Sequence, residues 1–567
     1  MGGGISPDSL IMTIKLILLG GRLTLVAMLL AASGLARAGE KTSANPEAMR
    51  SPVNQVFQFM HSAAFEYSVS NKVSATTYLW IPDHCRRLRG LLILGRNVPE
   101  HTLVGHPAIR AACAANDLGI FWSTPSYYSS NNKDAKKTTA FLQQLLTALA
   151  EKSGYDEVAT VPWLPIGESM HLGMVNHLLD AAPQRCVAGI YVKNASFNYK
   201  NRETPVLMSV GTSQEWDQEK TDIRTRWQNV SFSETLLKER AAFPNWPASL
   251  LVDGGSGHFE CPEVMVRYFA SYITAVAKTR MPTDSKQGLL PVTQNNGWLV
   301  GLPLPGQESF PPVAYDKANP DRRNAPWFLN ERLANEAFNL AAINWKAETQ
   351  MPAFKHSNGT PMPMTYRGIT RPIPIQTGAD GVTFELKGCL LPAIPTNFVA
   401  AGTPLARAPG SPSVEWVCGA VAPLGQDKFR IALDRTWPGS PIYVAVRHKG
   451  NAAIRSVVEP GSIDLIPNSS GAPQAITFAP IPDQPAGKIP ISLNATSDSG
   501  MPVEFFVVAG PAIVKNGNLE LTPIPPRTRF PITVTVTAWQ WGRAMAPQIQ
   551  TAKPVTQSFH LTKSRPD

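Results

Sequence analysis

The sequence has few charged residues and no hydrophobic run long enough to cross a bilayer. Asp, Glu, Lys and Arg make up 17% of the 567 residues, against 43% hydrophobic residues, a balance that excludes global disorder. No run of about 20 apolar residues occurs, so no membrane-spanning helix is expected. Glycine has no period of three, which excludes collagen, although the 51 prolines make up roughly 9% of the chain. The length predicts a globular protein of about three or four domains.

The first 38 residues have the pattern of an export signal. Lys15 and Arg22 precede the apolar residues 23–32, and Ala-Arg-Ala at 36–38 forms a small-x-small cleavage site. An uncleaved anchor is the alternative, but the two charges interrupt the apolar stretch. No cysteine lies near the cleavage site, which argues against a lipid anchor. We expect a periplasmic or extracellular protein without a stable membrane anchor.

The cysteines lack metal-binding spacing. Neither C-x-x-C nor H-E-x-x-H occurs, so neither a metal nor another cofactor is expected. There are six cysteines, at positions 85, 113, 186, 261, 389 and 418. An even number in an exported protein favours disulfides. Cys389 with Cys418 is the preferred pair because both lie in one β-rich segment, and the other pairings stay open.

The formal net charge of +10 raises the question of an anionic partner. The basic residues are scattered, however, and the densest cluster is the short Arg-Arg-Leu-Arg at 86–89. A nucleic-acid site requires a basic patch or stripe on one face. We therefore expect no nucleic-acid partner.

Short apolar runs alternate with helical patterns between about residues 60 and 282. Seven strands are expected, at 76–81, 90–94, 118–122, 160–166, 187–192, 205–210 and 249–252. Amphipathic helices are expected at 133–152 and 262–278. Strands that alternate with helices predict a mostly parallel sheet flanked by helices. We assign residues 39–282 to this α/β domain.

Proline and glycine become dense after residue 282, where a β-rich accessory region is expected over 283–470. It holds one helix, at 329–346, and strands are expected at 382–386, 413–418, 429–432 and 442–447. Residues 471–567 show about six short strands in close succession, which predicts a β-sandwich. The strings at 475–483, 499–505 and 509–512 resemble bacterial immunoglobulin-like modules. That resemblance implies a spacer or binding module.

The segment Pro-Ile-Gly-Glu-Ser-Met-His at 165–171 places a serine between an apolar run and a helical pattern. A nucleophilic serine needs this strand–turn–helix context, because the turn raises Oγ above the sheet edge and aims the next N–H, that of Met170, at a developing oxyanion. Gly167 removes a Cβ where the turn is tightest. The usual motif ends in glycine, and His171 occupies that place, where its side chain crowds the strand–helix contact.

An acid and a histidine follow Ser169 in the chain. Glu215 and Asp217 lie on the loop after the apolar run 204–211, and His258 lies in a glycine-rich loop after a strand and before the last helix of the domain. The order serine, acid, histidine is the one that the α/β-hydrolase scaffold requires. A solvated loop acid and a turn histidine are the ordinary alternatives.

Residues from about 70 to 282 resemble the α/β-hydrolase family, in the branch of exported esterases related to polyester depolymerases and feruloyl or acetyl esterases. The resemblance implies that Ser169 is the nucleophile and His258 the general base. It also implies that Glu215 orients His258, with Asp217 as the alternative because the loop is slightly long.

The strand end at 92–97 matches the segment that donates the second oxyanion N–H in this family, here from Arg96 or Asn97, although the doubled His-Gly of many relatives is missing. The resemblance implies a serine hydrolase that cleaves carboxylic esters through an acyl-enzyme. The expected substrates are small-molecule or polymeric esters, glycan-linked ones among them.

A non-catalytic adhesion or carbohydrate-binding protein on a degenerate hydrolase scaffold is the alternative function. His171 and the irregular acid loop favour it. Trp122, Trp163 and Trp216 lie near strand ends and are candidates to line an acyl or sugar pocket. Burial in the core is the alternative for these tryptophans.

Overall fold

The computed structural model describes residues 55–564, apart from 69, 214–220, 285–286, 366, 426 and 488–489. The described residues belong to one compact unit. The predicted export signal lies outside them. Among the described residues, no helix combines the length and the apolar character that crossing a membrane requires.

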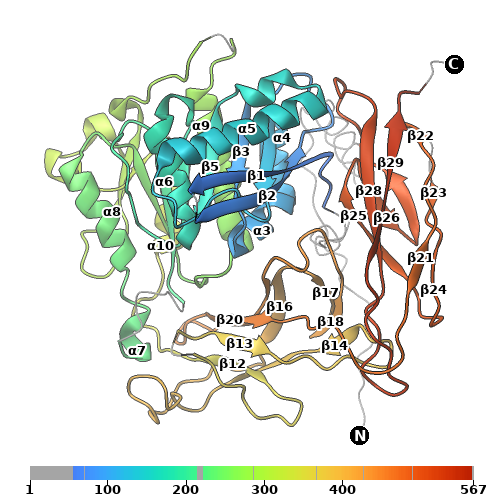
Figure 1. The fold of residues 1–567 in the computed structure, drawn as a ribbon. Coiled ribbons are helices and arrows are strands. Elements are labelled where there is room, and N and C mark those ends of the chain that lie inside the picture. Colours follow the sequence, from blue (N-terminus) through green and yellow to red (C-terminus); the bar gives the residue numbers. More distant parts are fainter. Residues whose placement is uncertain are drawn as a thin grey trace, which may run out of the picture. The chain divides into compact units, whose positions relative to one another are not determined.

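An eight-stranded sheet organises the first part of the described chain (Figure 1). Its spatial order is β1-β2-β4-β3-β5-β6-β7-β8. The strands are β1 (Phe59–Ser68), β2 (Asn71–Trp80), β3 (Gly90–Leu94), β4 (Leu118–Ser123), β5 (Trp163–Glu168), β6 (Gly189–Val192), β7 (Val206–Gly211) and β8 (Ala248–Asp253). β2 is antiparallel to β1 and β4, and the six strands β4-β3-β5-β6-β7-β8 run parallel to one another. This is the α/β-hydrolase fold, which confirms the predicted fold class.

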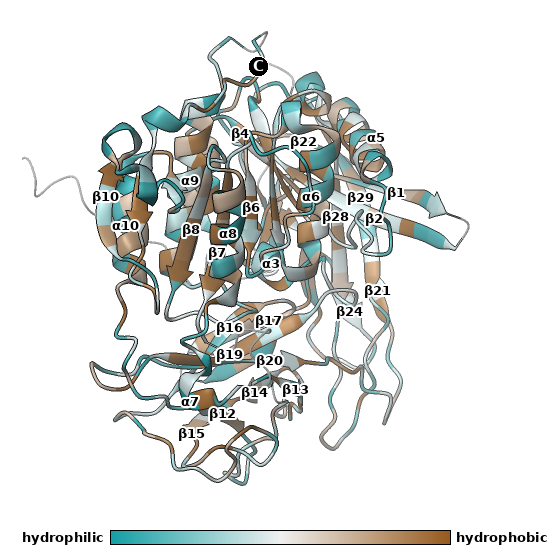
Figure 2. Cartoon of the chain, turned by 90° about the vertical axis from the view of Figure 1, so that its left-hand side faces the viewer, coloured by the Kyte–Doolittle hydropathy of each residue, from teal (hydrophilic) through white to brown (hydrophobic). Residues whose placement is uncertain are grey.

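Burial explains why most of these strands are visible in the sequence. Strands β3 to β8 are buried along their whole length, and Figure 2 shows β8 as a mainly hydrophobic ribbon. A parallel sheet covered on both faces reads as continuous apolar runs. β1 was not predicted, because its exposed and partly buried residues give no such run.

The helices flank the sheet in two layers. They are α3 (Val98–Gly105), α4 (Pro107–Ala114), α5 (Ala135–Ser153), α6 (Leu172–Ala181), α8 (Ser231–Ala242) and α9 (Glu263–Arg280). α4 contacts α9, and α5 contacts α6. Helix α5 begins where the Asp134 carboxylate accepts the N–H groups of Lys136 and Lys137, and it ends at Gly154 with φ of 77°.

The path of the chain opens a crevice at one edge of the sheet. From β3 the chain crosses to β4 in one direction, and from β4 it crosses back over β3 to β5. Since such crossovers are right-handed, the reversal puts α3 and α4 on one face and α5 on the other. Ligands of open α/β sheets bind outside the carboxyl ends of the strands at such a reversal. Here the reversal falls between β3 and β5.

The β-rich character predicted after residue 282 is confirmed. Its first part packs on the large sheet: β11 contacts β8, and α10 contacts β8 and α9. These elements are β9 (Trp298–Gly301), β10 (Phe310–Ala314), β11 (Trp327–Phe328) and α10 (Glu331–Ala341). Leu299, Trp327 and Leu333 share the hydrophobic core of the α/β part. The predicted domain limits stay predictions.

Three small sheets follow, with the orders β12-β15, β13-β20-β19-β16 and β14-β18-β17. We call residues 352–463, which hold them, the middle region. Its strands are β12 (Pro352–Lys355), β13 (Thr370–Ile373), β14 (Thr383–Glu385), β15 (Lys387–Leu390), β16 (Ser413–Cys418), β17 (Val421–Gly425), β18 (Lys428–Ile431), β19 (Ile442–His448) and β20 (Val457–Ile463).

The last part of the chain, residues 476–562, forms sheets of orders β21-β24, β22-β29-β28-β25 and β23-β27-β26. We call it the tail. Its strands are β21 (Ile476–Phe478), β22 (Gln484–Pro485), β23 (Ile491–Ser492), β24 (Ala495–Ser497), β25 (Glu504–Ala509), β26 (Ala512–Lys515), β27 (Asn518–Leu521), β28 (Ile532–Trp539) and β29 (Val555–Thr562). The immunoglobulin-like resemblance stays a prediction.

The prediction of disulfides is wrong. All six cysteines lie in the described part of the chain, and each is a free thiol. Cys389 packs in a cluster around Met351, whereas Cys418 packs with Val98 and Tyr443 in another cluster, so the two side chains serve different cores. Burial raises the pKa of the Cys418 thiol.

Candidate active site

Ser169 stands at the tip of a sharp turn between β5 and α6. Its φ is 49°, a left-handed conformation that non-glycine residues rarely adopt. Its Oγ lies 3.0 Å from Nε2 of His258. Gly167 is required by the same turn, because a Cβ there would lie 2.6 Å from the carbonyl oxygen of His171. The turn thus holds the hydroxyl at the carboxyl edge of the sheet, next to an imidazole.

The crowding expected from His171 is relieved by the neighbouring strand. Residue 95 follows β3 and is glycine, and a Cβ there would lie 2.9 Å from Cε1 and Nδ1 of the His171 ring. Gly95 therefore leaves the space that the imidazole fills. Nδ1 of His171 lies 3.3 Å from Oε1 of Glu100 on α3. The motif with histidine in place of glycine therefore fits without a clash between His171 and the neighbouring strand.

Two buried carboxylates, those of Glu100 and Glu168, lie against the turn. Oε1 of Glu100 accepts the N–H of Glu168 at 3.0 Å, and Oε1 of Glu168 lies 3.3 Å from Nε2 of His258. Both side chains are fully buried. The amide of Asn97 donates to the carbonyl of Glu168 at 3.1 Å. These bonds fix the residue before Ser169 and place its carboxylate next to the His258 ring. Sequence reasoning missed Glu100 and the contact of Glu168.

His258 comes from the glycine-rich loop between β8 and α9, as predicted. Within the loop, the N–H of Gly257 donates to Oε1 of Glu260 at 3.0 Å. The ring of Phe259 meets the His258 ring edge-on at 4.9 Å and stacks on Tyr443 of the middle region at 5.2 Å. The loop is therefore held by its own carboxylate and by an aromatic contact from outside the α/β part.

The middle region anchors the histidine loop through a buried ion pair. The Arg447 guanidinium on β19 donates to the carbonyl of Gly255 at 2.6 Å and pairs with Glu260. Burial raises the pKa of the Glu260 carboxyl, and the Arg447 charge opposes that shift. A buried carboxylate of this kind needs its cation, so Arg447 is a positioning residue for the segment that carries His258.

The middle region also holds the loop after β7, through hydrogen bonds. The Ser213 hydroxyl accepts the N–H of Val458 at 3.2 Å and donates to its carbonyl at 3.4 Å. Arg455 donates to the carbonyl of Thr212 at 3.0 Å. Because β7 and β8 are neighbours, with Gly211 opposite Asp253, this loop leaves the sheet beside the one that carries His258.

The two acids predicted for this loop, Glu215 and Asp217, lie outside the described residues, as does Trp216. The choice between the acids stays open. Trp122 and Trp163 are fully buried, and the indole N–H of Trp122 donates to the carbonyl of Gly95 at 3.1 Å. These two tryptophans belong to the hydrophobic core.

The three residues predicted for the oxyanion hole all lie beside the turn. Met170 follows Ser169 and is 65% exposed. Arg96 and Asn97 follow β3, the strand that pairs with β5, and Asn97 occupies the N-cap position of α3. The assignment of their N–H groups to an oxyanion stays a prediction.

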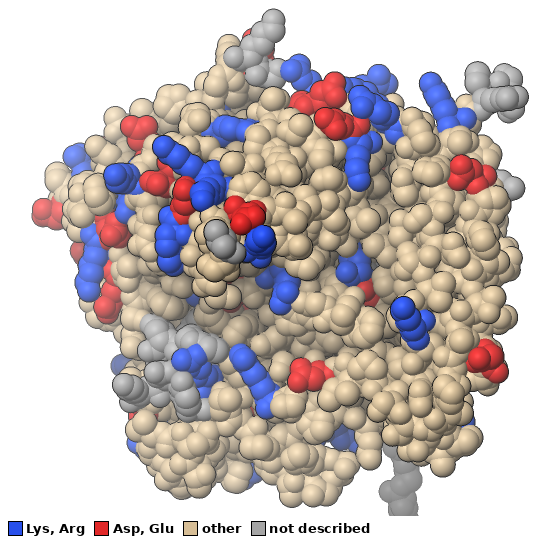
Figure 3. Space-filling model, viewed as in Figure 1, with Lys and Arg blue, Asp and Glu red and all other residues tan. Residues whose placement is uncertain are grey.

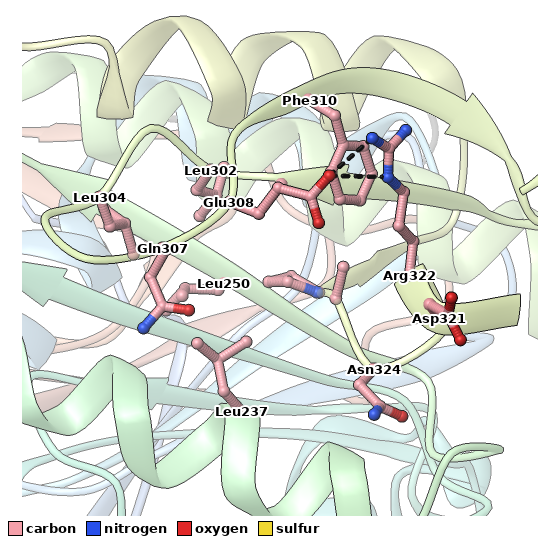
Figure 4. A pocket seen from close by; sticks show the side chains of 13 residues that line it. Leu237, Leu250, Leu302, Leu304, Gln307, Glu308, Phe310, Asp321, Arg322 and Asn324 are labelled. Carbon is pink, nitrogen blue, oxygen red and sulfur yellow. Dashed lines mark hydrogen bonds and ion pairs between the residues drawn. The ribbon is translucent and has the colours of Figure 1, made fainter. Parts of the chain in front are cut away.

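Described residues of the α/β part line several cavities, two of which bear on where a substrate could bind. One, of about 380 Å³, opens beside the turn and is lined by Arg96, Tyr128, Met170 and His171 among others. The other, of about 200 Å³, lies between α8, β8 and the β9–β10 segment, where Glu308 and Arg322 form an ion pair of 2.6 Å (Figure 4). It contains none of the predicted site residues. Among the described residues, no group of three or more His, Cys, Asp or Glu side chains is placed to hold a metal ion.

The fold and this site define an α/β-hydrolase scaffold. Its sharp turn between β5 and α6, which we call the elbow, places the Ser169 hydroxyl next to His258. No protein-family model matches the sequence, and no curated protein does. Solved structures that match part of it include a thermostable esterase (10% identity, TM-score 0.25, covering 36% of this chain and 56% of the esterase). This chain therefore spans little more than half of that esterase.

Two further matches cover nearly all of the other chain. A poly(3-hydroxybutyrate) depolymerase from Bordetella parapertussis is 15% identical, with a TM-score of 0.26, over 40% of this chain and 93% of the depolymerase. A monoglyceride lipase from Saccharomyces cerevisiae is 9% identical, with a TM-score of 0.28, over 41% of this chain and 98% of the lipase. The fold assignment rests on strand order and direction and not on these distant likenesses.

Proposed function

We propose that the protein hydrolyses carboxylic esters with Ser169 as the nucleophile and His258 as the general base. The observation that carries the proposal is the Ser169 hydroxyl, held at a φ of 49° and 3.0 Å from Nε2 of His258 at the carboxyl edge of the sheet. A strained backbone at a nucleophile is a recurrent device for exposing the hydroxyl.

In the first half-reaction, Nε2 of His258 takes the Ser169 proton as Oγ attacks the ester carbonyl. The oxyanion is stabilised by the N–H of Met170 and by that of Arg96 or Asn97. The imidazolium then gives its proton to the alkoxide that leaves, and the acyl group stays on Oγ. In the second half-reaction, His258 takes a proton from water as the hydroxide attacks the acyl-enzyme. The imidazolium then returns that proton to Oγ of Ser169 as the acid leaves.

The third member of the triad is Glu215 or Asp217, on the loop that Ser213 and Thr212 tie to the middle region. A carboxylate there orients His258 and stabilises the imidazolium. The proposed location is the periplasm or the exterior of the cell, where the substrate is a small-molecule or polymeric ester.

The test is reaction with a fluorophosphonate probe and turnover of 4-nitrophenyl acetate. We expect the parent to be labelled, and Ser169→Ala to lose the label and to lower turnover by roughly 10³-fold or more with unchanged thermal unfolding. Ser62→Ala, at an exposed serine of β1, is the matched control and should behave as the parent. A parent that is neither labelled nor active supports the alternative, a non-catalytic binding protein on this scaffold.

A further inference from the structure

The cavity of about 380 Å³ beside the elbow is built from four separate segments. The β1–β2 hairpin supplies Lys72, the end of β3 supplies Arg96, the segment after β4 supplies Tyr128, and the elbow supplies Met170 and His171. The residues adjacent to the nucleophile thus form part of its lining. A substrate bound at Ser169 would extend into this cavity on one side.

The charge of the cavity has one sign. Among the described residues that line it, the ionisable groups with a fixed charge are Lys72 and Arg96, and none is a carboxylate. Lys72 lies at the rim, largely exposed, and pairs with Glu66 across the hairpin at 3.4 Å. Its charge is therefore already balanced within the protein.

Arg96 differs from Lys72 in its exposure and in its contacts. It is half-buried, and within the described part of the chain its guanidinium makes no ion pair and no hydrogen bond. Burial lowers the pKa of Arg96, as expected for a cation that no carboxylate balances. A guanidinium has five N–H donors, and leaving them unused in a partly desolvated place is unfavourable.

We propose that Arg96 binds a carboxylate of the substrate, so that the preferred esters carry an acidic group close to the scissile carbonyl. This rests on the proposed function, because it places the acid relative to acylation at Ser169. The planar guanidinium matches a carboxylate with two parallel hydrogen bonds. The cavity offers one unbalanced positive charge, which fits one carboxylate better than a doubly charged phosphate.

The test compares two esters of equal chain length, 4-nitrophenyl hemisuccinate and 4-nitrophenyl butyrate. We expect the parent to favour the hemisuccinate in kcat/KM by about 10- to 100-fold, the effect of one charge-assisted pair. In Arg96→Gln that ratio should fall to near one, and in Arg96→Lys it should be intermediate. Lys72→Met is the matched control and should change the ratio less than about threefold, because Lys72 is exposed and already paired.

The ratio of the two esters cancels any effect of position 96 on the oxyanion hole, which both esters share. Equal ratios in the parent and in Arg96→Gln, with a labelled Ser169, would overturn the Arg96 proposal and leave the proposed function standing. If Ser169 is not labelled and neither ester reacts, the proposed function fails.

Binding then decides the Arg96 proposal on its own. Calorimetry on Ser169→Ala protein should show tighter binding of monomethyl succinate than of methyl butyrate. In the double variant Ser169→Ala/Arg96→Gln, the affinity for monomethyl succinate should fall by about tenfold or more, to that for methyl butyrate. Equal affinity for the two probes in the Ser169→Ala protein would reject the proposal.

Discussion

The middle region and the tail are both built from small β-sheets, yet they contact opposite edges of the central sheet. The middle region contacts segments that follow the carboxyl ends of strands: Val417 accepts from Thr102 on α3 at 3.1 Å, and Ser440 lies 2.8 Å from Thr124 after β4. The tail contacts the segment that precedes β5, where Arg527 pairs with Glu157 at 2.9 Å. Among the described residues, these contacts place the middle region at the edge that carries Ser169 and His258, and the tail at the opposite edge.

The chemistry of the two interfaces differs accordingly. The side chains of Arg447 and Glu260 are 19% and 6% exposed, whereas that of Arg527 is 42% exposed. Figure 3 shows charged side chains of both signs interspersed over the α/β part and sparse over the tail on the face in view. The middle region thus contacts the edge that carries the proposed catalytic residues, and the tail contacts the opposite edge.

The largest expected effect follows from Arg447→Met, which leaves the buried Glu260 without its cation. We expect a loss of about 3–5 kcal/mol in the free energy of unfolding. The loop that carries His258 also loses its anchor at Gly255, so kcat for 4-nitrophenyl acetate should fall by about 100-fold with little change in KM. Urea unfolding and steady-state kinetics measure the two effects.

The double variant with Glu260→Gln separates the two roles of Arg447. It removes the unbalanced charge and should restore most of the stability while kcat stays low, because Gly255 is still not held. A kcat equal to that of the parent in the single variant would show that the middle region does not position the catalytic loop.

The second effect concerns His101 on α3, a helix that β16 of the middle region contacts. Burial, with smaller contributions from the charges of Arg96 and His171, lowers the pKa of His101 to about 3. The unfolded chain takes up this proton below about pH 6.5, and the folded chain does not, so stability falls as the pH falls. From pH 7 to pH 5 the loss from this one residue is about 2 kcal/mol.

In His101→Leu, the free energy of unfolding should therefore fall by about 2 kcal/mol less than in the parent between pH 7 and pH 5. His560→Gln, at an exposed position in the tail, is the control and should leave the dependence as in the parent. Chemical denaturation at the two pH values gives the comparison, and parallel curves for His101→Leu and the parent would contradict the prediction.

The smallest effect is expected at the tail. Arg527→Met removes a partly exposed ion pair with Glu157 and a contact of the guanidinium with the Tyr155 ring at 5.1 Å. Such pairs contribute about 0–1 kcal/mol, and the site is far from the carboxyl edge, so kcat should stay within about twofold of the parent. A large loss of activity would mean that the two β-rich regions do not divide their roles as described.

The central strands could be predicted because burial on both faces leaves a continuous apolar signal. Helix α3 could not, because six of its eight residues are buried and no polar face gives it a period. The disulfide prediction failed because an even number of cysteines does not show which thiols lie close enough to form a bond.

In the site, Ser169 and His258 were found from a local turn motif and from chain order. Glu100 and Arg447 were not, since their partners His171 and Glu260 lie 71 and 187 residues away in sequence. Such roles arise from packing between distant segments, and a single sequence does not record which segments meet.

Gly95 and His171 share one volume at the elbow, and this has a consequence for how such proteins are found. The room that a glycine usually provides at the second position after the nucleophile is provided here by a glycine on the adjacent strand. Two positions can therefore exchange large and small side chains while the elbow keeps its shape. A search pattern that demands glycine on both sides of the serine would pass over this chain, whereas one that asks for a single glycine at either of these two places would retain it.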